Sequence, residues 1–218
     1  MTAAVVIDRA HGRAPQQTRS RETLARITEA AETLFAERGY EGTTVGDIAG
    51  RARCSVGSFY ARFKDKESLL LHVHDRQCGM LVERMQFLCD LLRAESAPLD
   101  ECVRQIVRGL FRHAAGRRSL TRVFIERSGV DEGFHARYAR AWGEVRARLL
   151  PLLLARRADI HRPDPDGAAD FVIQMLHAAW ANDVLHHKVK DLTGQKTGDA
   201  LIAQLTDACL AHLDGARG

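Results

Sequence analysis

The residues from Arg51 to Lys66 have the composition of a surface that binds a polyanion. Five side chains in this stretch are basic and one, Asp65, is acidic, so its net charge of +4 equals that of the whole chain. The rest of the chain is therefore close to neutral. A local positive patch on a neutral body favours contact with phosphates, and a solvated charged face is the alternative that charge alone leaves open.

The stretch CSVGSFYARFKDKESL, at residues 54–69, adds side chains that suit a nucleic-acid surface. Ser55 is of the type that caps a helix N-terminus, where free backbone N–H groups favour a phosphate. Gly57 has no side chain, so a duplex can approach the backbone closely. Beside it, Val56 offers an apolar contact, for instance to a thymine methyl, and Ser58 offers a hydroxyl.

The aromatic residues of the same stretch divide between an inner and an outer face. Phe59 and Phe63 are four residues apart and share the inner face of a helix. Tyr60 directly follows Phe59 and therefore points outward, where its phenol can reach a phosphate. Lys64 and Lys66 stand at the start of the next helix and can neutralise further phosphates.

Three predicted helices position these side chains. The first covers residues 20–38 with one apolar stripe, and Gly39 suits the left-handed position that ends a helix. The second opens at Thr44, with Asp47 three residues later as a variant of the capping box. The third begins after Ser55. Two short helices joined by a tight turn and braced by another form a helix-turn-helix, whose second helix enters the major groove of DNA.

The rest of the chain also has helical periodicity, so we predict an all-α fold of about nine helices. Residues 1–17 have no apolar period and are predicted to form a disordered arm. We predict a DNA-binding domain over residues 18–66 and a helical effector-binding and dimerisation domain over residues 67–218. The further helices are predicted at residues 66–93, 98–115, 118–129, 131–156, 165–190 and 198–214.

Other features of the sequence exclude several classes of protein. The longest apolar run, near residues 149–155, is too short to cross a membrane, and the N-terminus lacks the apolar core of a signal peptide, so we expect a cytoplasmic protein. The five cysteines include no CxxC pair and indicate buried free thiols. His186 and His187 are adjacent and point some 100° apart on a helix, so we expect no metal and no cofactor. No nucleophile elbow or triad signature occurs, so we expect no enzyme.

Residues 20–69 resemble the N-terminal domain of the tetracycline-repressor (TetR) family of transcriptional regulators. The features that carry the resemblance are AAETLFAERGYEGTTV, then IA in the second helix, then S-x-G-S-F-Y and F-K-x-K-E-x-L. The block is about fifty residues long and the combination is specific. The chain length and the helical remainder also fit this family, whose C-terminal domains diverge widely.

The resemblance implies roles for particular positions. Thr44 caps the second helix and touches phosphate, and Lys66 makes a further phosphate contact. Arg53 stands where the family usually has glycine, and its side chain adds a positive charge near the DNA. With the basic Lys64, the predicted DNA-binding residues are Thr44, Arg53, Ser55, Val56, Gly57, Ser58, Tyr60, Arg62, Lys64 and Lys66.

Three departures from the family pattern affect DNA reading. Arg53 costs on the order of 1 kcal/mol if the turn keeps a left-handed conformation. Gly46 replaces a longer residue and costs about 1 kcal/mol in helix propensity. Val56 and Ala61 are apolar where polar or aromatic side chains are frequent. We therefore expect few direct hydrogen bonds to bases, with reliance on DNA shape or on Arg62 as a hypothesis.

The resemblance also implies a ligand pocket and a homodimer. The broad apolar faces of helices 165–190 and 198–214 fit either a plain core or a four-helix dimer interface, and the family favours the interface. A two-fold dimer would cover both half-sites of a palindrome. Aromatic and methionine residues of the middle helices could line the pocket, although each alone is more often plain core: Phe87, Phe111, Phe124, Trp142, Met175 and Trp180.

The expected function is a DNA-binding transcriptional regulator, and a repressor in particular. It would bind a palindromic operator as a homodimer and be released by an unknown small-molecule effector. An activator, or a regulator without small-molecule control, stays open as an alternative. An all-helical enzyme or binding protein with an incidental helix-turn-helix is the rival from another class.

Overall fold

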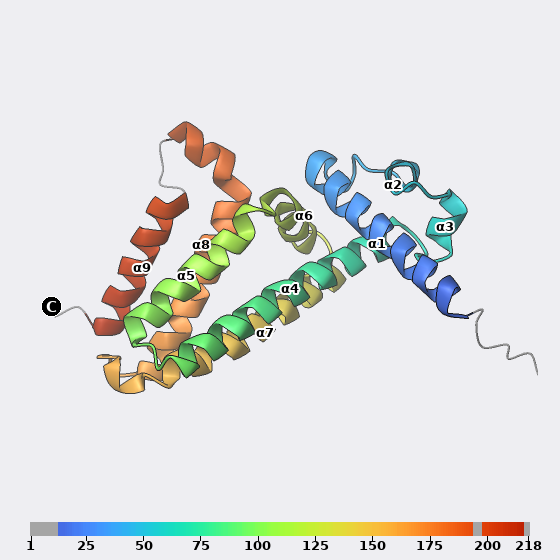
Figure 1. Ribbon diagram of the computed structural model, residues 1–218. Coiled ribbons are helices and arrows are strands. Elements are labelled where there is room, and N and C mark those ends of the chain that lie inside the picture. The colour runs from blue at the N-terminus through green and yellow to red at the C-terminus, as the bar shows by residue number, and fades with distance from the viewer. Residues whose placement is uncertain (1–12, 194–197, 216–218) are drawn as a thin grey trace, which may run out of the picture. The chain divides into compact units, whose positions relative to one another are not determined.

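The structure is a computed structural model that describes residues 13–193 and 198–215. In this part of the chain it contains nine α-helices, one short 3-10 helix and no strand, so the predicted all-α class is confirmed (Figure 1). The chain divides into two compact units, one ending at Val73 and the other beginning at His74. No helix of the described residues is long and apolar enough to cross a membrane.

The first unit contains three helices and the beginning of a fourth. These are α1 (Arg13–Arg38), α2 (Val45–Arg51), α3 (Val56–Tyr60) and α4 (Lys66–Ala94). Helix α1 starts earlier than predicted, because residues 13–17, assigned to the disordered arm, are helical. Polar composition alone did not exclude a helix there. The rest of the predicted arm, residues 1–12, lies outside the described residues.

A small apolar core holds α1, α2 and α3 together. Phe35, Ile48 and Phe59, one from each helix, are fully buried. Gly39 ends α1 with φ +73°, the left-handed conformation predicted for it, and its N–H donates to the carbonyl of Phe35. The buried Thr43 hydroxyl then donates to the Gly39 carbonyl at 2.8 Å. This buried hydrogen bond therefore stabilises the loop before α2.

The second unit contains the rest of α4 and five further α-helices. The helices are α5 (Leu99–Ala115), α6 (Arg118–Ser128), α7 (Glu132–Leu154), the 3-10 helix η2 (Arg157–Asp159), α8 (Pro165–Thr193) and α9 (Gly198–Asp214). The predicted boundaries agree with these to within a few residues, except that α8 is bent at His186, which has non-helical φ and ψ. Asp164 caps α8 by accepting the N–H of Gly167.

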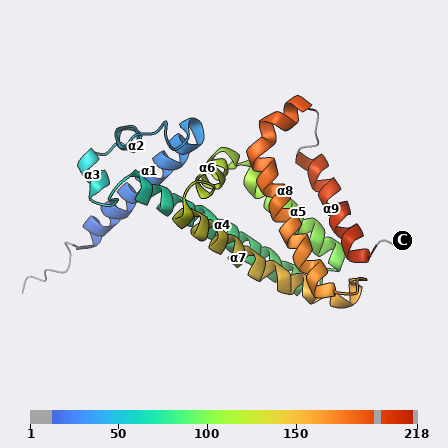
Figure 2. The same ribbon diagram turned by 180° about the vertical axis from the view of Figure 1, so that it is seen from behind.

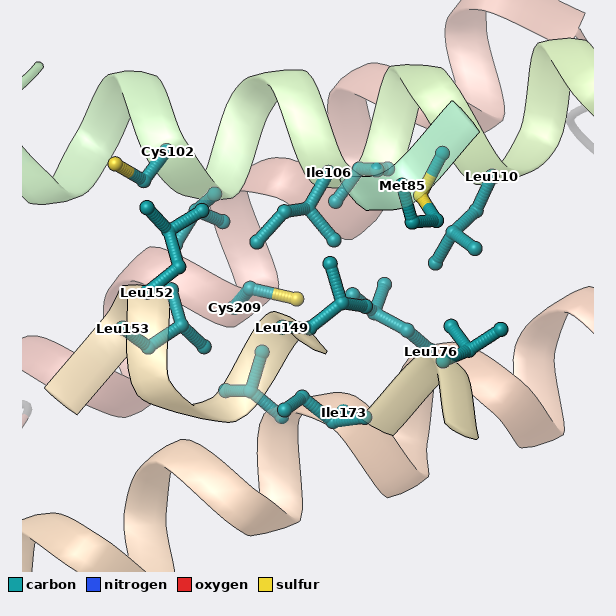
Figure 3. Close-up of a cluster of buried hydrophobic side chains, with 14 of the residues drawn as sticks. Met85, Cys102, Ile106, Leu110, Leu149, Leu152, Leu153, Ile173, Leu176 and Cys209 are labelled. Carbon is teal, nitrogen blue, oxygen red and sulfur yellow. The ribbon is translucent and has the colours of Figure 1, made fainter. Parts of the chain in front are cut away.

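Helices α4 and α7 run side by side, and α5 packs against α7, α8 and α9 (Figure 2). The core of this unit is made where these helices meet. Figure 3 shows Met85, Ile106, Leu149 and Leu176, from four different helices, pointing toward one another. All four are almost fully buried.

The five cysteines are free thiols, but the predicted burial holds for only three of them. Cys89, Cys102 and Cys209 are buried, whereas Cys54 and Cys78 are half-buried. Burial raises the pKa of the Cys209 thiol to about 12. A thiol with so high a pKa is a poor nucleophile at neutral pH, so Cys209 acts as a small apolar core residue.

Candidate DNA-binding site

Helix α2 begins with the predicted capping box. The backbone N–H of Asp47 donates to the Thr44 hydroxyl at 3.1 Å, and the Thr44 N–H donates to the Asp47 carboxylate at 3.0 Å. The Thr44 hydroxyl also donates to that carboxylate at 2.6 Å. These hydrogen bonds hold the pKa of Asp47 below its usual range. The hydroxyl proton of Thr44 is therefore already bonded, and a phosphate at this position would have to compete with Asp47.

The turn between α2 and α3 contains a strained residue. Arg53 is exposed and has φ +51°, in the left-handed region that favours glycine. The turn closes with the N–H of Cys54 donating to the carbonyl of Ala49 at 3.0 Å. The left-handed conformation that the family's usual glycine would adopt is thus kept here at an energetic cost. An arginine at this position is explained if its charge contributes to binding.

Helix α3 presents an exposed N-terminal half. Ser55 caps it by accepting the N–H of Ser58, and the two hydroxyls lie 2.9 Å apart. Ser55 and Gly57 are exposed, and Val56 and Tyr60 have 45% and 56% of their surface accessible. Only the side chain of Phe59 is buried within this helix. Ser55, Val56 and Gly57 are therefore exposed at the start of this short helix, and Tyr60 is exposed at its end.

Gly57 of α3 and Gly46 of α2 have space around them. A Cβ built at Gly57 would meet only the Ser55 hydroxyl, at 3.8 Å, and one at Gly46 only the Thr44 hydroxyl, at 3.7 Å. Helix interiors disfavour glycine by about 1 kcal/mol relative to alanine. The fold alone does not require glycine at these positions, which suits a surface approached closely by another molecule.

Arg62 is bound inside the unit. Its guanidinium donates to the carbonyl of Ser58 at 2.8 Å and to the Ser20 hydroxyl at 3.3 Å. The side chain is half-buried, and it ties the end of α3 to α1. That Arg62 reads bases stays a prediction. To contact a base, its guanidinium would first have to break the hydrogen bonds to Ser58 and Ser20.

The two lysines of the site lie in different environments. Lys64 is exposed, with no hydrogen bond or ion pair to another described residue. The ammonium of Lys66 donates to the carbonyls of Tyr40 and Thr43 at 2.8 and 2.9 Å and lies 4.1 Å from the centre of the Tyr40 ring. Lys66 thus fixes the loop before α2, and one of its three protons stays available for a phosphate.

The structure adds one basic residue that the sequence did not single out. Arg26 of α1 lines an open groove of about 370 Å³ together with Arg51, Arg53 and Thr33. The Nε of Arg26 donates to the carbonyl of Ala52, at the start of the turn. No local pattern identifies Arg26, because it is separated from Ala52 by 26 residues.

The six aromatic and methionine residues predicted to line a ligand pocket do not all line one cavity of the second unit. Trp142 and Trp180 line one apolar cavity. Phe111 and Phe124 are buried, and Met175 packs against the main core. Phe87 does not fit the prediction, because 71% of its surface is exposed. On α4 it lies two residues from the buried Met85, about 200° around the helix and away from the core.

The cavity also contains residues that the sequence did not indicate. Cys78 of α4 and Tyr138 and Ala141 of α7 line it with the two tryptophans. Among the described side chains no group of three metal-ligand residues occurs; the His187 side chain lies outside them.

Comparison with known proteins identifies the first unit. Residues 27–73 match the profile of bacterial regulatory proteins of the tetR family. The A-factor receptor protein of Streptomyces griseus is 30% identical over 161 residues, which are 72% of this chain and 54% of the relative. The repressor KstR2 of Mycolicibacterium smegmatis is 36% identical over 87 residues, 40% of either chain. The chain spans between 16% and 54% of the length of the curated relatives that it matches.

A solved structure extends the likeness beyond the helix-turn-helix. A protein of Mesorhizobium loti described as a TetR-family transcriptional regulator superposes with a TM-score of 0.65 at 25% identity, covering 90% of this chain and 95% of its own. The fold and the exposed helix α3 define a helix-turn-helix DNA-binding regulator. The chain belongs to the TetR family of transcriptional regulators. Several of the relatives and solved structures are named as transcriptional regulators or repressors.

The strained turn gives a first testable prediction. Replacing Arg53 by glycine should raise the free energy of unfolding by about 1 kcal/mol, because the left-handed conformation no longer carries a Cβ. The same variant should bind DNA less tightly, with the slope of log affinity against log salt reduced by about one per protomer, because a phosphate contact is lost. An unchanged slope would show that Arg53 makes no phosphate contact. Chemical denaturation and titration at several salt concentrations provide both measurements.

The two lysines form a matched pair for a second prediction. Lys66→Met should lower the free energy of unfolding by about 2 kcal/mol, because two carbonyls lose a charged donor. Lys64→Met should leave stability unchanged and reduce the salt slope by about one per protomer. Denaturation curves and salt titrations of both variants measure these effects. If Lys66→Met reduces the slope as much as Lys64→Met does, then Lys66 also binds phosphate, through its remaining proton.

Arg62→Ala should lower the free energy of unfolding by about 1–2 kcal/mol and weaken operator binding, because α3 loses its tie to α1. We expect the salt slope to change little, since the guanidinium is already bound to protein carbonyl and hydroxyl groups. Arg62→Lys serves as a control that keeps the charge without the two-pronged geometry. Unchanged affinity and selectivity in Arg62→Ala would remove Arg62 from the site altogether.

Proposed function

We propose that the protein is a transcriptional repressor that binds a palindromic operator as a homodimer and is released by a small-molecule effector. The observation that carries the DNA-binding part is the exposed N-terminal half of α3, where Ser55, Val56 and Gly57 are exposed and basic residues lie nearby. A protein acting on operators works at the chromosome, so we place it in the cytoplasm.

The proposed reading mode uses few direct hydrogen bonds. The exposed end of α3 offers a valine, a glycine and two hydroxyls that already bond one another. Apolar contact with thymine methyl groups and close backbone approach would supply part of the specificity, and DNA shape the rest. Basic residues at the rim, Arg53 and Lys64 among them, would supply most of the affinity through phosphates.

Helices α8 and α9 are the proposed dimer interface. They pack against each other, and their outward positions include several small residues, which let two helices approach closely. Phe171 of α8 is apolar and 50% exposed. Two such helices from each protomer would make a four-helix bundle. The exposed alanines of the described parts of these helices are Ala178, Ala200, Ala203, Ala208 and Ala211.

Release by an effector is proposed as a shift between two states. The effector would bind within the second unit and favour a state in which the two reading helices no longer fit successive major grooves. Helix α4 contributes residues to both units and is the candidate lever. The names of two relatives, a repressor and a receptor for A-factor, support repression and ligand control.

Selection of bound fragments from genomic DNA tests the proposal. The expected result is a palindrome that the protein binds with a steep salt dependence, while a scrambled fragment binds weakly. Transcription in vitro from the flanking promoter separates a repressor from the alternative, an activator or a regulator without ligand control. Weak, sequence-independent binding would favour the rival class, an enzyme or binding protein with an incidental helix-turn-helix.

A further inference from the structure

Three aromatic rings of the second unit form a near-parallel stack. Trp142 and His177 have ring centroids 4.1 Å apart with planes 19° from parallel. Trp180 lies 6.1 Å from Trp142 at 22°, and the Tyr138 hydroxyl lies 3.0 Å from Nε2 of His177. The stack joins α7 to α8. Planar π surfaces arranged in this way favour further stacking with another aromatic ring.

The stack borders a cavity of about 40 Å³ between α4, α7 and α8. Apart from the aromatic rings and Cys78, its walls are the apolar side chains of Leu81, Ala141 and Val145. A polar or charged ligand would lose its hydration there without compensation. The walls therefore favour an apolar molecular surface.

The titratable groups around the cavity are uncharged at neutral pH. Burial raises the pKa of the Cys78 thiol to about 12 and also raises the pKa of the Tyr138 phenol. Burial lowers the pKa of His177, so its imidazole is neutral. No charge on these groups would balance an ionic ligand, which favours an uncharged one.

One of the residues lining the cavity has a hydrogen-bond donor without an acceptor among the described residues. Trp180 is 6% exposed, and its indole N–H has no partner among the described residues. A buried donor without an acceptor is costly, and such groups are usually bonded in native structures. An acceptor on a bound molecule would remove this cost.

A neighbouring cleft offers a path to the cavity. The cleft has a volume of about 260 Å³ and is lined by polar groups that include Asp75, Arg137 and Glu144. Cys78 and Ala141 line both the cleft and the cavity. A ligand could therefore place a ring in the cavity and a polar substituent in the cleft.

We propose that this cavity is the effector site and that the effector is an uncharged planar aromatic molecule with a hydrogen-bond acceptor facing the Trp180 N–H. The proposal rests on the proposed ligand control of this protein. The cavity without ligand is smaller than a bicyclic molecule, so binding separates Trp142 from Trp180. Because these are the two tryptophans of the chain, their fluorescence reports directly on occupation of the site.

Isothermal titration of the full chain with two probes of equal shape tests the proposal. Naphthalene has no acceptor, whereas quinoline carries a ring nitrogen and is uncharged at mildly alkaline pH. Quinoline should bind at least about tenfold more tightly than naphthalene, because only quinoline accepts the Trp180 N–H. Decanoate is the third probe and represents aliphatic anions. It should bind more weakly than quinoline.

A variant of Trp180 tests whether its indole N–H causes the preference for quinoline. Trp180→Phe keeps a ring in the stack but removes the N–H, so quinoline affinity should fall to that of naphthalene. Phe87→Leu, at an exposed position of α4, should change neither affinity. If Trp180→Phe fails to fold, as judged by circular dichroism, the affinities of quinoline and naphthalene for the unsubstituted chain still test the proposal.

Three results would overturn the proposal: equal binding of quinoline and naphthalene, tighter binding of decanoate than of quinoline, or no binding of either aromatic probe. Operator binding measured with and without saturating quinoline separates this proposal from the function on which it rests. Tight quinoline binding with unchanged operator affinity would support the site and contradict ligand control. Reduced operator affinity would support both.

Discussion

Replacing Gly57 by leucine should strongly weaken operator binding while leaving the protein folded. A Cβ at Gly57 meets nothing closer than the Ser55 hydroxyl at 3.8 Å, so the protein itself has room for the side chain. Leucine is also a better helix former than glycine by roughly 0.8 kcal/mol, so stability should hold or rise slightly. In the complex, however, the side chain would occupy the space into which the duplex must come.

The expected loss of affinity is roughly 100-fold. Disturbing one base-pair contact costs about 1–3 kcal/mol, and a two-fold dimer carries the substitution at both half-sites. Gel-shift titration with the selected operator measures the loss, and thermal unfolding measures the stability.

Gly143→Leu is the matched control, since Gly143 is exposed on α7 and a Cβ there meets nothing within 4 Å. Gly143→Leu should change neither operator affinity nor thermal stability. Normal operator binding by Gly57→Leu would mean that α3 does not face the groove at this position.

Replacing Ala208 by arginine should convert the protein to a monomer and lower operator affinity by roughly 1,000-fold. Ala208 is exposed on α9, so the substitution does not disturb the core of the protomer. In the proposed four-helix interface it would bring two buried arginines close to the two-fold axis, where neither has a partner. Once the protomers separate, the second half-site no longer contributes at high effective concentration.

Sedimentation velocity and binding to full and half operators measure this prediction. Ala139→Arg, the same substitution at an exposed position of α7, should leave the dimer and its affinity unchanged. If Ala208→Arg still forms a dimer, then the interface does not include this face of α9. If it is a monomer that binds the full operator normally, then the protein does not require two half-sites.

Local signals in the sequence determined where the short helices begin and end. The Thr44–Asp47 box, the Ser55 cap and the left-handed Gly39 were all predicted, and each appears in the structure. Such signals involve groups at most four residues apart, so the hydrogen bonds that satisfy a helix end are visible in a short stretch of sequence. The same block of residues identified the family.

Tertiary structure decided what the long side chains contact. Lys66 bonds carbonyls 23 and 26 residues away, and Arg62 reaches Ser20 across 42 residues. Trp142 and Trp180 meet because α7 and α8 pack together, whereas Phe87 faces outward although its residue type favours burial. Residue type and periodicity specify which helices form, but the partners of a flexible side chain depend on which helices come together, and no spacing along the chain encodes that.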